Sequence, residues 1–107
     1  MQALETRPRI RLSQICLSIL LAKDEVGVCA YCPELDLIVQ SQATETAIDD
    51  MIEESKEYAA EYLAEIDLYS NSPNRAHHLP YVKMIADCKD DWELKEMFEI
   101  RYGRLQF

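Results

Sequence analysis

The sequence of 107 residues has little glycine or proline, with two and four residues respectively. This scarcity excludes long flexible linkers and low-complexity tails, which are rich in such residues. Gly27 and Gly103 are far apart, so a glycine-rich phosphate-binding loop is excluded too. The length suits a single domain, which we place at residues 1–107.

Basic residues are also scarce, because 11 lysines and arginines stand against 20 aspartates and glutamates, for a net charge of −9. A protein that binds nucleic acid non-specifically normally has the opposite balance. The longest apolar stretch, residues 15–22, is too short to cross a bilayer. The N-terminal sequence lacks the apolar core of a signal peptide. We therefore expect a cytoplasmic protein that does not bind membranes.

The four cysteines should be reduced thiols in that compartment. Cys29 and Cys32 form a Cys-x-x-Cys pair, a spacing found in zinc and redox sites. However, the two residues between them do not favour a turn, and in a strand the two sulfurs would point to opposite faces. We therefore expect structural cysteines, no metal and no cofactor, with a metal or redox protein as the alternative.

Three strands are predicted in the first part of the chain. Residues 10–22 alternate weakly and then run apolar, which is typical of a largely buried strand. A polar stretch before Gly27 predicts a hairpin turn into a second strand at 26–32, which Pro33 ends. Residues 35–41 alternate between apolar and polar and predict a third strand. The order indicates a three-stranded antiparallel meander.

A helical period replaces the strand pattern from Ala47. Apolar residues recur at spacings of three and four, which predicts a helix of about five turns that ends near Ile66 or Asp67. Serine or threonine within residues 41–44 should cap its first N–H groups. The fold class is therefore α+β (β-β-β-α), with a core at residues 10–67. The helix should lie across the sheet with these residues: Ile48, Met51, Ile52, Tyr58, Tyr62, Leu63 and Ile66.

Residues 68–107 predict a mainly helical C-terminal extension. Pro80 is well placed for the first turn of one helix. Asp90 begins a capping-box-like sequence for a further helix, whose apolar face would include Phe98. A short last strand within residues 100–107 is the alternative to a tail.

Carboxylates accumulate on the long predicted helix. Nine acidic residues and one basic residue lie between Glu45 and Asp67, so this segment contributes −8 of the net charge. Like charges four residues apart destabilise a helix by roughly 0.2–0.5 kcal/mol per pair. The segment is either a solvated helix face or a docking face for a basic partner. Six of the carboxylates follow one another at intervals of four: Glu45, Asp49, Glu53, Glu57, Glu61 and Glu65.

No group of residues in the sequence is typical of catalysis. His77 and His78 are adjacent in a polar loop, without a serine or cysteine partner nearby in the sequence. Metal-dependent nucleases need carboxylates that converge from several elements into a cleft, which one helix face does not provide. We therefore expect a protein that is not an enzyme.

A short motif lies between the second strand and the helix. Gly27 and Ala30 precede Pro33-Glu34-Leu35, and a polar turn then leads to Ala47. This order resembles the HicB-type antitoxin family over about residues 13–66. The resemblance implies a partial ribonuclease-H-like sheet packed on one helix, and a non-catalytic role in blocking a small mRNA-cleaving toxin.

The C-terminal extension departs from that family. Many members carry a DNA-binding module there, whereas residues 68–107 hold six basic and six acidic residues without a basic face. We therefore expect no clear DNA-binding module. A basic cluster of Arg7, Arg9 and Arg11 near the N-terminus is interpreted as a solvated strand edge.

The leading hypothesis is a HicB-like antitoxin that binds a small basic toxin protein. The alternative is a stand-alone homo-oligomer built through exposed strand edges and the aromatic residues Tyr81, Trp92, Phe98 and Phe107. The candidate partner-binding residues are Pro33, Glu34, Leu35, Asp49, Glu53, Glu57 and Glu61.

Overall fold

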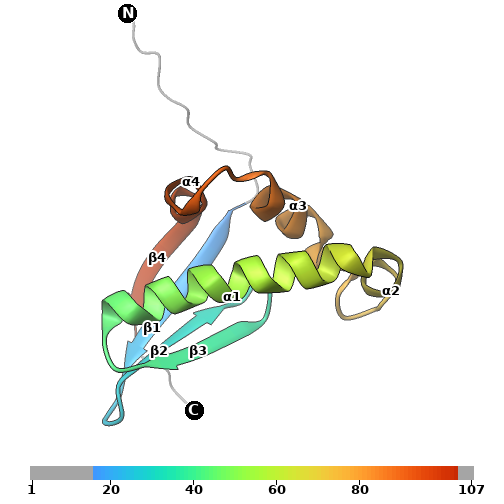
Figure 1. The fold of residues 1–107 in the computed structure, drawn as a ribbon. Coiled ribbons are helices and arrows are strands. Elements are labelled where there is room, and N and C mark those ends of the chain that lie inside the picture. Colours follow the sequence, from blue (N-terminus) through green and yellow to red (C-terminus); the bar gives the residue numbers. More distant parts are fainter. Residues whose placement is uncertain (1–15, 104–107) are drawn as a thin grey trace, which may run out of the picture.

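The structure is a computed structural model and describes residues 16–103, so the Arg7–Arg11 cluster lies outside the described residues. It confirms the predicted α+β fold, with three strands followed by a long helix (Figure 1). No described helix is long and apolar enough to cross a membrane. The elements are β1 (Leu17–Lys23), β2 (Val28–Cys32), β3 (Leu37–Ser41), α1 (Thr44–Ala64), α2 (Ile66–Ser70), a 3-10 turn (Ala76–His78), α3 (Leu79–Asp87), α4 (Asp91–Glu96) and β4 (Phe98–Gly103).

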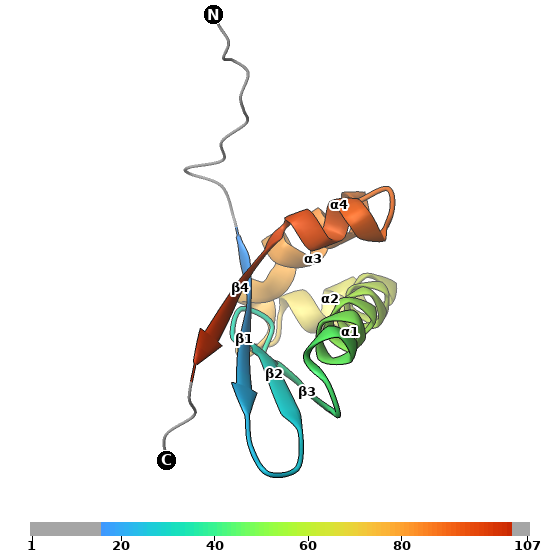
Figure 2. The same ribbon diagram turned by 90° about the vertical axis from the view of Figure 1, so that its left-hand side faces the viewer.

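The four strands form one sheet in the order β3-β2-β1-β4. The predicted meander is confirmed, because β1 pairs antiparallel with β2 and β2 pairs antiparallel with β3. The last strand, which was the alternative to a tail, pairs parallel with β1. A parallel pair needs a long crossover connection, and here the helices supply it. Figure 2 shows that all four helices lie on the same side of the sheet.

The predicted hairpin turn joins β1 to β2. The carboxylate of Asp24 accepts hydrogen bonds from the backbone N–H groups of Val26 and Gly27, at 2.8 and 2.9 Å. A Cβ atom on Gly27 would collide with the backbone oxygen of Ser41. This glycine is therefore required because the end of β3 passes too close for any side chain.

The core lies between the sheet and the helix layer. Alternate residues of β1 and β2 are buried, as the strand pattern predicts. The buried face of α1 includes Met51, Ile52 and Tyr62, each at most 2% exposed. Ser55 is also fully buried in this face, and its hydroxyl donates to the backbone oxygen of Ile52 at 2.8 Å. The other residues of the predicted stripe are buried or partly buried: Ile48, Tyr58, Leu63 and Ile66.

The prediction that serine or threonine caps α1 is wrong. Ala43 is the N-cap residue, and no side chain caps the helix. The hydroxyl groups of Ser41 and Thr46 instead hydrogen-bond to each other, and Thr46 also donates to the backbone oxygen of Ala43. Ser41 is still the last residue of β3, so it lies too early to cap the helix.

The predicted helix starts of the extension are confirmed, whereas one helix end is not. Pro80 lies in the first turn of α3. Asp90 caps α4, because its carboxylate accepts from the N–H of Glu93 at 2.9 Å. Phe98 was predicted on the apolar face of this helix, but α4 ends at Glu96 and Phe98 begins β4. Pairing with Leu17 of β1 buries Phe98 in the core by another route.

Candidate partner-binding site on helix α1

The carboxylates of α1 do not form one stripe. Successive residues of an α-helix are rotated by about 100° around its axis. Side chains four residues apart therefore differ in direction by about 40°, and a series at intervals of four moves around the helix. The nine carboxylates of the acidic segment are all exposed, and five of those on α1 lie against neighbouring elements on two different sides of the helix. We call Asp49 and Glu53 the α4 flank, and Glu54, Glu57 and Glu61 the pocket flank.

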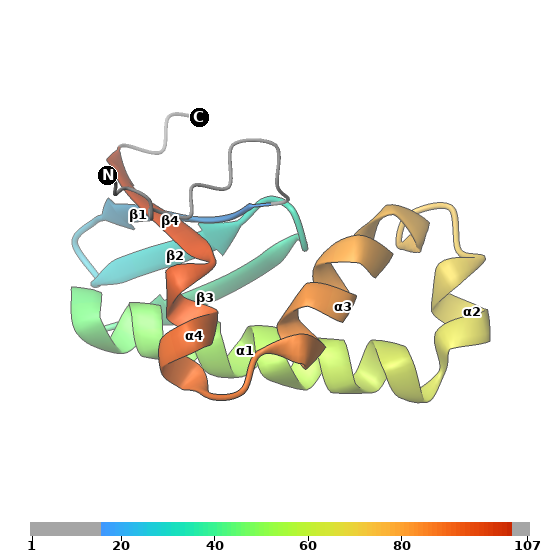
Figure 3. The same ribbon diagram turned by 90° about the horizontal axis from the view of Figure 1, so that it is seen from above.

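The α4 flank is tied to α4 by ion pairs. Nζ of Lys56 lies 3.1 Å from Glu53 and 2.8 Å from Asp91, and Nζ of Lys95 lies 3.2 Å from Asp49. Hydrogen bonds first to Asp91 and then to Glu53 raise the pKa of Lys56. Figure 3 shows α4 lying across the N-terminal half of α1, which carries these carboxylates. Asp49 therefore links α1 to α4 directly, and Glu53 does so through Lys56.

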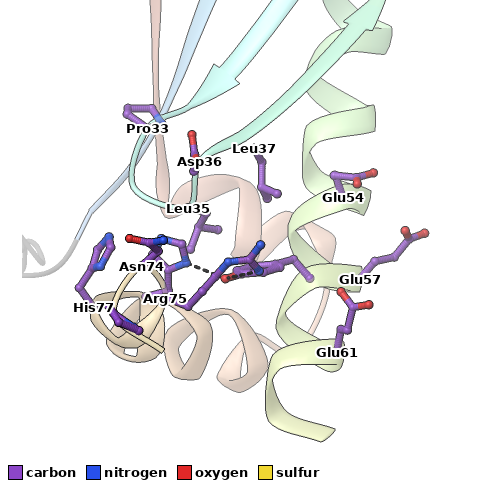
Figure 4. Close-up of a pocket in the computed structure, with 13 residues that line it drawn as sticks. Pro33, Leu35, Asp36, Leu37, Glu54, Glu57, Glu61, Asn74, Arg75 and His77 are labelled. Atoms are coloured by element: carbon purple, nitrogen blue, oxygen red, sulfur yellow. Dashed lines mark hydrogen bonds between the residues drawn. The ribbon is translucent and has the colours of Figure 1, made fainter. Parts of the chain in front are cut away.

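The pocket flank forms one wall of a concave pocket of about 900 Å³. The turn between β2 and β3 and the loop after α2 form the other walls (Figure 4). Among the described residues, no salt bridge involves a carboxylate of the pocket flank. The lining residues are Pro33, Leu35, Asp36, Leu37, Glu54, Glu57, Tyr58, Glu61, Pro73, Asn74, Arg75, His77 and His78.

A cluster of aromatic rings fixes the loop that closes the pocket. Tyr62 stacks on Tyr69 with ring centroids 5.1 Å apart, and its hydroxyl donates to the backbone oxygen of Arg75 at 2.9 Å. The guanidinium of Arg75 lies 5.5 Å from the ring centroids of both Tyr58 and Tyr69. Such cation–π contacts hold Arg75 against the rings.

A buried hydrogen bond lies at the base of the same wall. The hydroxyl of Tyr58 lies 2.6 Å from Nδ1 of His78, which is 3% exposed. Burial raises the pKa of Tyr58, and burial, followed by the nearby His77 and Arg75, lowers the pKa of His78. These shifts keep the phenol protonated and the imidazole neutral, so the hydrogen bond between them ties the loop to α1 and supplies no charge to the pocket.

The Pro33-Glu34-Leu35 triplet has mostly internal contacts. The carboxylate of Glu34 accepts hydrogen bonds from the backbone N–H and the hydroxyl of Ser18, at 2.8 and 2.9 Å. Leu35 is 1% exposed and belongs to the core. Only Pro33 is exposed, at the rim of the pocket. Glu34 and Leu35 thus shape the turn that forms this wall.

Arg75 and Asp36 line the pocket but were not predicted as site residues. The spacing of Tyr58, Tyr62 and Tyr69 could have indicated a cation-binding position, because their rings cluster and a cation can stack on them. Which cation stacks on these rings depends on how the loop after α2 folds back onto α1, and the residue spacing does not determine the path of that loop.

The cysteine pair adopts the predicted strand geometry. Cys29 is partly exposed and Cys32 is buried, because they lie on opposite faces of β2. Burial raises the pKa of the Cys32 thiol to about 11. Within residues 16–103, no group of three or more histidine, cysteine, aspartate or glutamate side chains is arranged to hold a metal ion.

Most of the chain matches a known protein family. A model of the PHD-like family, described as an antitoxin of toxin–antitoxin systems of the RelE/RelB type, matches residues 12–100. The chain belongs to this antitoxin family. It is therefore the non-catalytic partner in a toxin–antitoxin system, and it neutralises a toxin.

A solved structure supports the fold. The antitoxin part of a toxin/antitoxin system from Syntrophomonas wolfei subsp. wolfei superposes with a TM-score of 0.77. It is 24% identical to this antitoxin, and the match covers 86% of this chain and 67% of that chain. At this identity the likeness shows a shared fold. A search of curated proteins gave no match.

Proposed function

We propose that this antitoxin acts in the cytoplasm on a small, basic, mRNA-cleaving toxin, and that it contacts the toxin through the acidic side of α1. The resemblance to HicB-type antitoxins is the reason to propose an mRNA-cleaving toxin. The concentration of charge on and just after α1 carries the proposal, because residues 45–67 hold nine carboxylates and one lysine, and seven of these carboxylates lie on α1. All nine carboxylates are exposed, so a partner can reach them.

Charge complementarity explains how such contact would neutralise the toxin. An enzyme that cleaves RNA binds the phosphate backbone with lysine and arginine side chains. Carboxylates on α1 would occupy those same cations and exclude the RNA. Complementary charges also speed association and make it sensitive to salt.

The predicted binding residues contribute unequally to this proposal. Glu57 and Glu61 lie on the pocket flank, and Pro33 lies beside them at the rim. Asp49 and Glu53 are exposed, but each is paired with a lysine. The pocket flank therefore offers the negative charge that a partner can neutralise at the lowest cost, because no existing ion pair has to break.

Charge reversal tests the proposal. The antitoxin is co-expressed with the protein encoded by the neighbouring reading frame, and the complex is isolated through a tag on that protein. The triple variant Glu54→Lys, Glu57→Lys and Glu61→Lys, which reverses the pocket flank alone, should lose the complex, with an association rate that falls by about tenfold or more. Retention of the complex by the triple variant would overturn the proposal.

A control variant carries the same change in net charge on other elements. It combines Glu25→Lys in the hairpin, Asp87→Lys at the end of α3 and Glu96→Lys at the end of α4. All three positions are exposed, and none forms a salt bridge within residues 16–103. This control should retain the complex, so that loss in the first variant reports the location of the charge rather than its total.

Homo-oligomerisation is a second candidate function, which we propose on the exposure of apolar side chains near β4. Trp92 and Tyr102 are 73% and 75% exposed. Trp92 was a predicted dimer residue, whereas Tyr102 was not. Of the remaining predicted residues, Phe98 is buried, Tyr81 is half-buried and Phe107 lies outside the described residues. Light scattering of the isolated antitoxin tests this candidate, and a strict monomer would exclude it.

A further inference from the structure

The two edges of the sheet differ in how they are protected. An edge strand presents unpaired N–H and C=O groups, and proteins commonly protect such edges with charged residues or proline. At one edge, β4 carries Glu99 and Arg101. At the other edge, β3 has the sequence Leu-Ile-Val-Gln-Ser, with neither charge nor proline.

Within residues 16–103, the outer side of β3 has no backbone partner. This strand pairs with β2 only, and among the described residues no other backbone hydrogen bond reaches it. Ile38, in the middle of the strand, is 64% exposed. The edge is therefore open to a further strand, which would take up its N–H and C=O groups.

The open edge leads directly into the acidic pocket. Asp36 and Leu37, at the start of β3, line the pocket together with the pocket flank of α1. Figure 4 shows these two residues opposite the carboxylates of Glu54 and Glu57. The pocket thus lies beside one end of an added strand. The first residues of that strand would pass the pocket if it ran parallel to β3, and its last residues if it ran antiparallel.

We propose that β3 receives an extended segment of the toxin as a fifth strand, and that the pocket receives a lysine or arginine side chain of that segment. The inference rests on the proposed function, since it assumes a basic toxin. Strand addition of this kind takes its affinity from backbone hydrogen bonds and its specificity from pockets for alternate side chains.

The surroundings of β3 also predict which residue types alternate along the toxin segment. Side chains of a strand point alternately to the two faces of its sheet. Those on the helix side would meet the carboxylates of the pocket flank and Asp36, whereas those on the other side would lie beside Ile38. Arg75 is held over the tyrosine rings, so the cation would bind on the carboxylate side of the pocket. The segment should therefore alternate basic and apolar residues.

Hydrogen exchange of the complex tests the strand addition. The probe is the protein encoded by the neighbouring reading frame, bound to the full antitoxin. Alternate amides of β3, those that point away from β2, should exchange about tenfold or more slowly in the complex. The amides of β4 should keep their rates. A complex in which the β3 amides exchange as fast as in the free antitoxin would overturn the inference.

A matched pair of variants gives a second readout. Ile38→Lys places a charge on the open edge strand, and Ile100→Lys makes the same change on β4 at the other edge. Both side chains are exposed, by 64% and 39%, so both variants should fold. Ile38→Lys should weaken toxin binding by about tenfold, whereas Ile100→Lys should change it by less than about twofold.

The outcomes separate the two proposals. Loss of binding in the triple charge reversal, with no effect of Ile38→Lys and no change in β3 exchange, would reject the added strand and retain the acidic contact. Binding that survives the triple reversal would reject the proposed function itself. Equal effects of Ile38→Lys and Ile100→Lys would also reject the added strand.

Discussion

The two flanks of α1 carry the same kind of side chain and differ in what surrounds them. On the α4 flank, Asp49 pairs with Lys95 of α4, and Glu53 pairs with Lys56, which in turn pairs with Asp91 of α4, so that these ion pairs link α4 to α1. On the pocket flank, three carboxylates face a concave space and pair with no cation of the described residues. One flank therefore serves the fold, and the other is available to a partner.

This difference shows that the spacing of charges along a helix does not define a binding face. The i, i+4 series runs from one flank to the other as it drifts around the helix. The neighbouring elements then decide the role of each carboxylate. Here Lys95 of α4 and Lys56 of α1 pair with one flank, whereas the turn after β2 and the loop after α2 leave the other flank open.

The largest expected effect concerns the core under both flanks. Ile52 is 2% exposed, and Ile52→Asp would bury a carboxylate without a partner. We expect the variant to lose its cooperative thermal unfolding transition. Ala60→Asp adds the same charge at an exposed position of α1 and should keep the transition. A folded Ile52→Asp protein would show that the flanks do not depend on this packing.

A smaller effect is expected from His78 in the wall of the pocket, which should make the stability of the fold depend on pH. Burial lowers the pKa of His78 below its ordinary value of 6.5. As the pH falls below that value, the unfolded chain binds a proton that the folded one does not bind, so stability falls. The melting temperature should therefore drop between about pH 7.5 and pH 5.5.

Two variants locate this pH dependence. His78→Gln should reduce the drop, because glutamine has no group that titrates in this range. His77→Gln, at the exposed neighbouring position, should keep most of the drop, because burial lowers the pKa of His78 more than His77 does. If both variants keep the full drop, His78 is not the group responsible.

The smallest effect is expected on the α4 flank. Lys95→Met removes the ion pair with Asp49, which joins two partly exposed side chains at 3.2 Å. Such a pair contributes less than about 1 kcal/mol, so the midpoint of urea unfolding should fall only slightly. Toxin binding should remain unchanged. Weaker binding in this variant would mean that the α4 flank also contacts the toxin.

Local signals in the sequence predicted most of the fold. The change from a period of two to a period of 3.6 marked the step from β3 to α1, and Pro80 and Asp90 marked the starts of α3 and α4. The meander and the buried face of α1 followed from the same patterns. These features depend on neighbours within a few residues, which a single sequence contains.

Features that depend on distant residues were missed. The pairing of β4 with β1 joins positions about 80 residues apart, as Leu17 and Phe98 show. An apolar residue such as Phe98 fits a helix face or a strand equally well, and only the available partner decides. The division of the α1 carboxylates and the position of Arg75 in the pocket also depend on tertiary packing.

The central claim is that the pocket flank, rather than the α4 flank, binds the toxin. The most direct measurement is the toxin affinity of two variants that each neutralise two carboxylates of α1. Glu57→Gln with Glu61→Gln should weaken binding by about tenfold, whereas Asp49→Asn with Glu53→Gln should change it by less than about twofold. Equal losses in the two variants, or a larger loss in the second, would contradict the account.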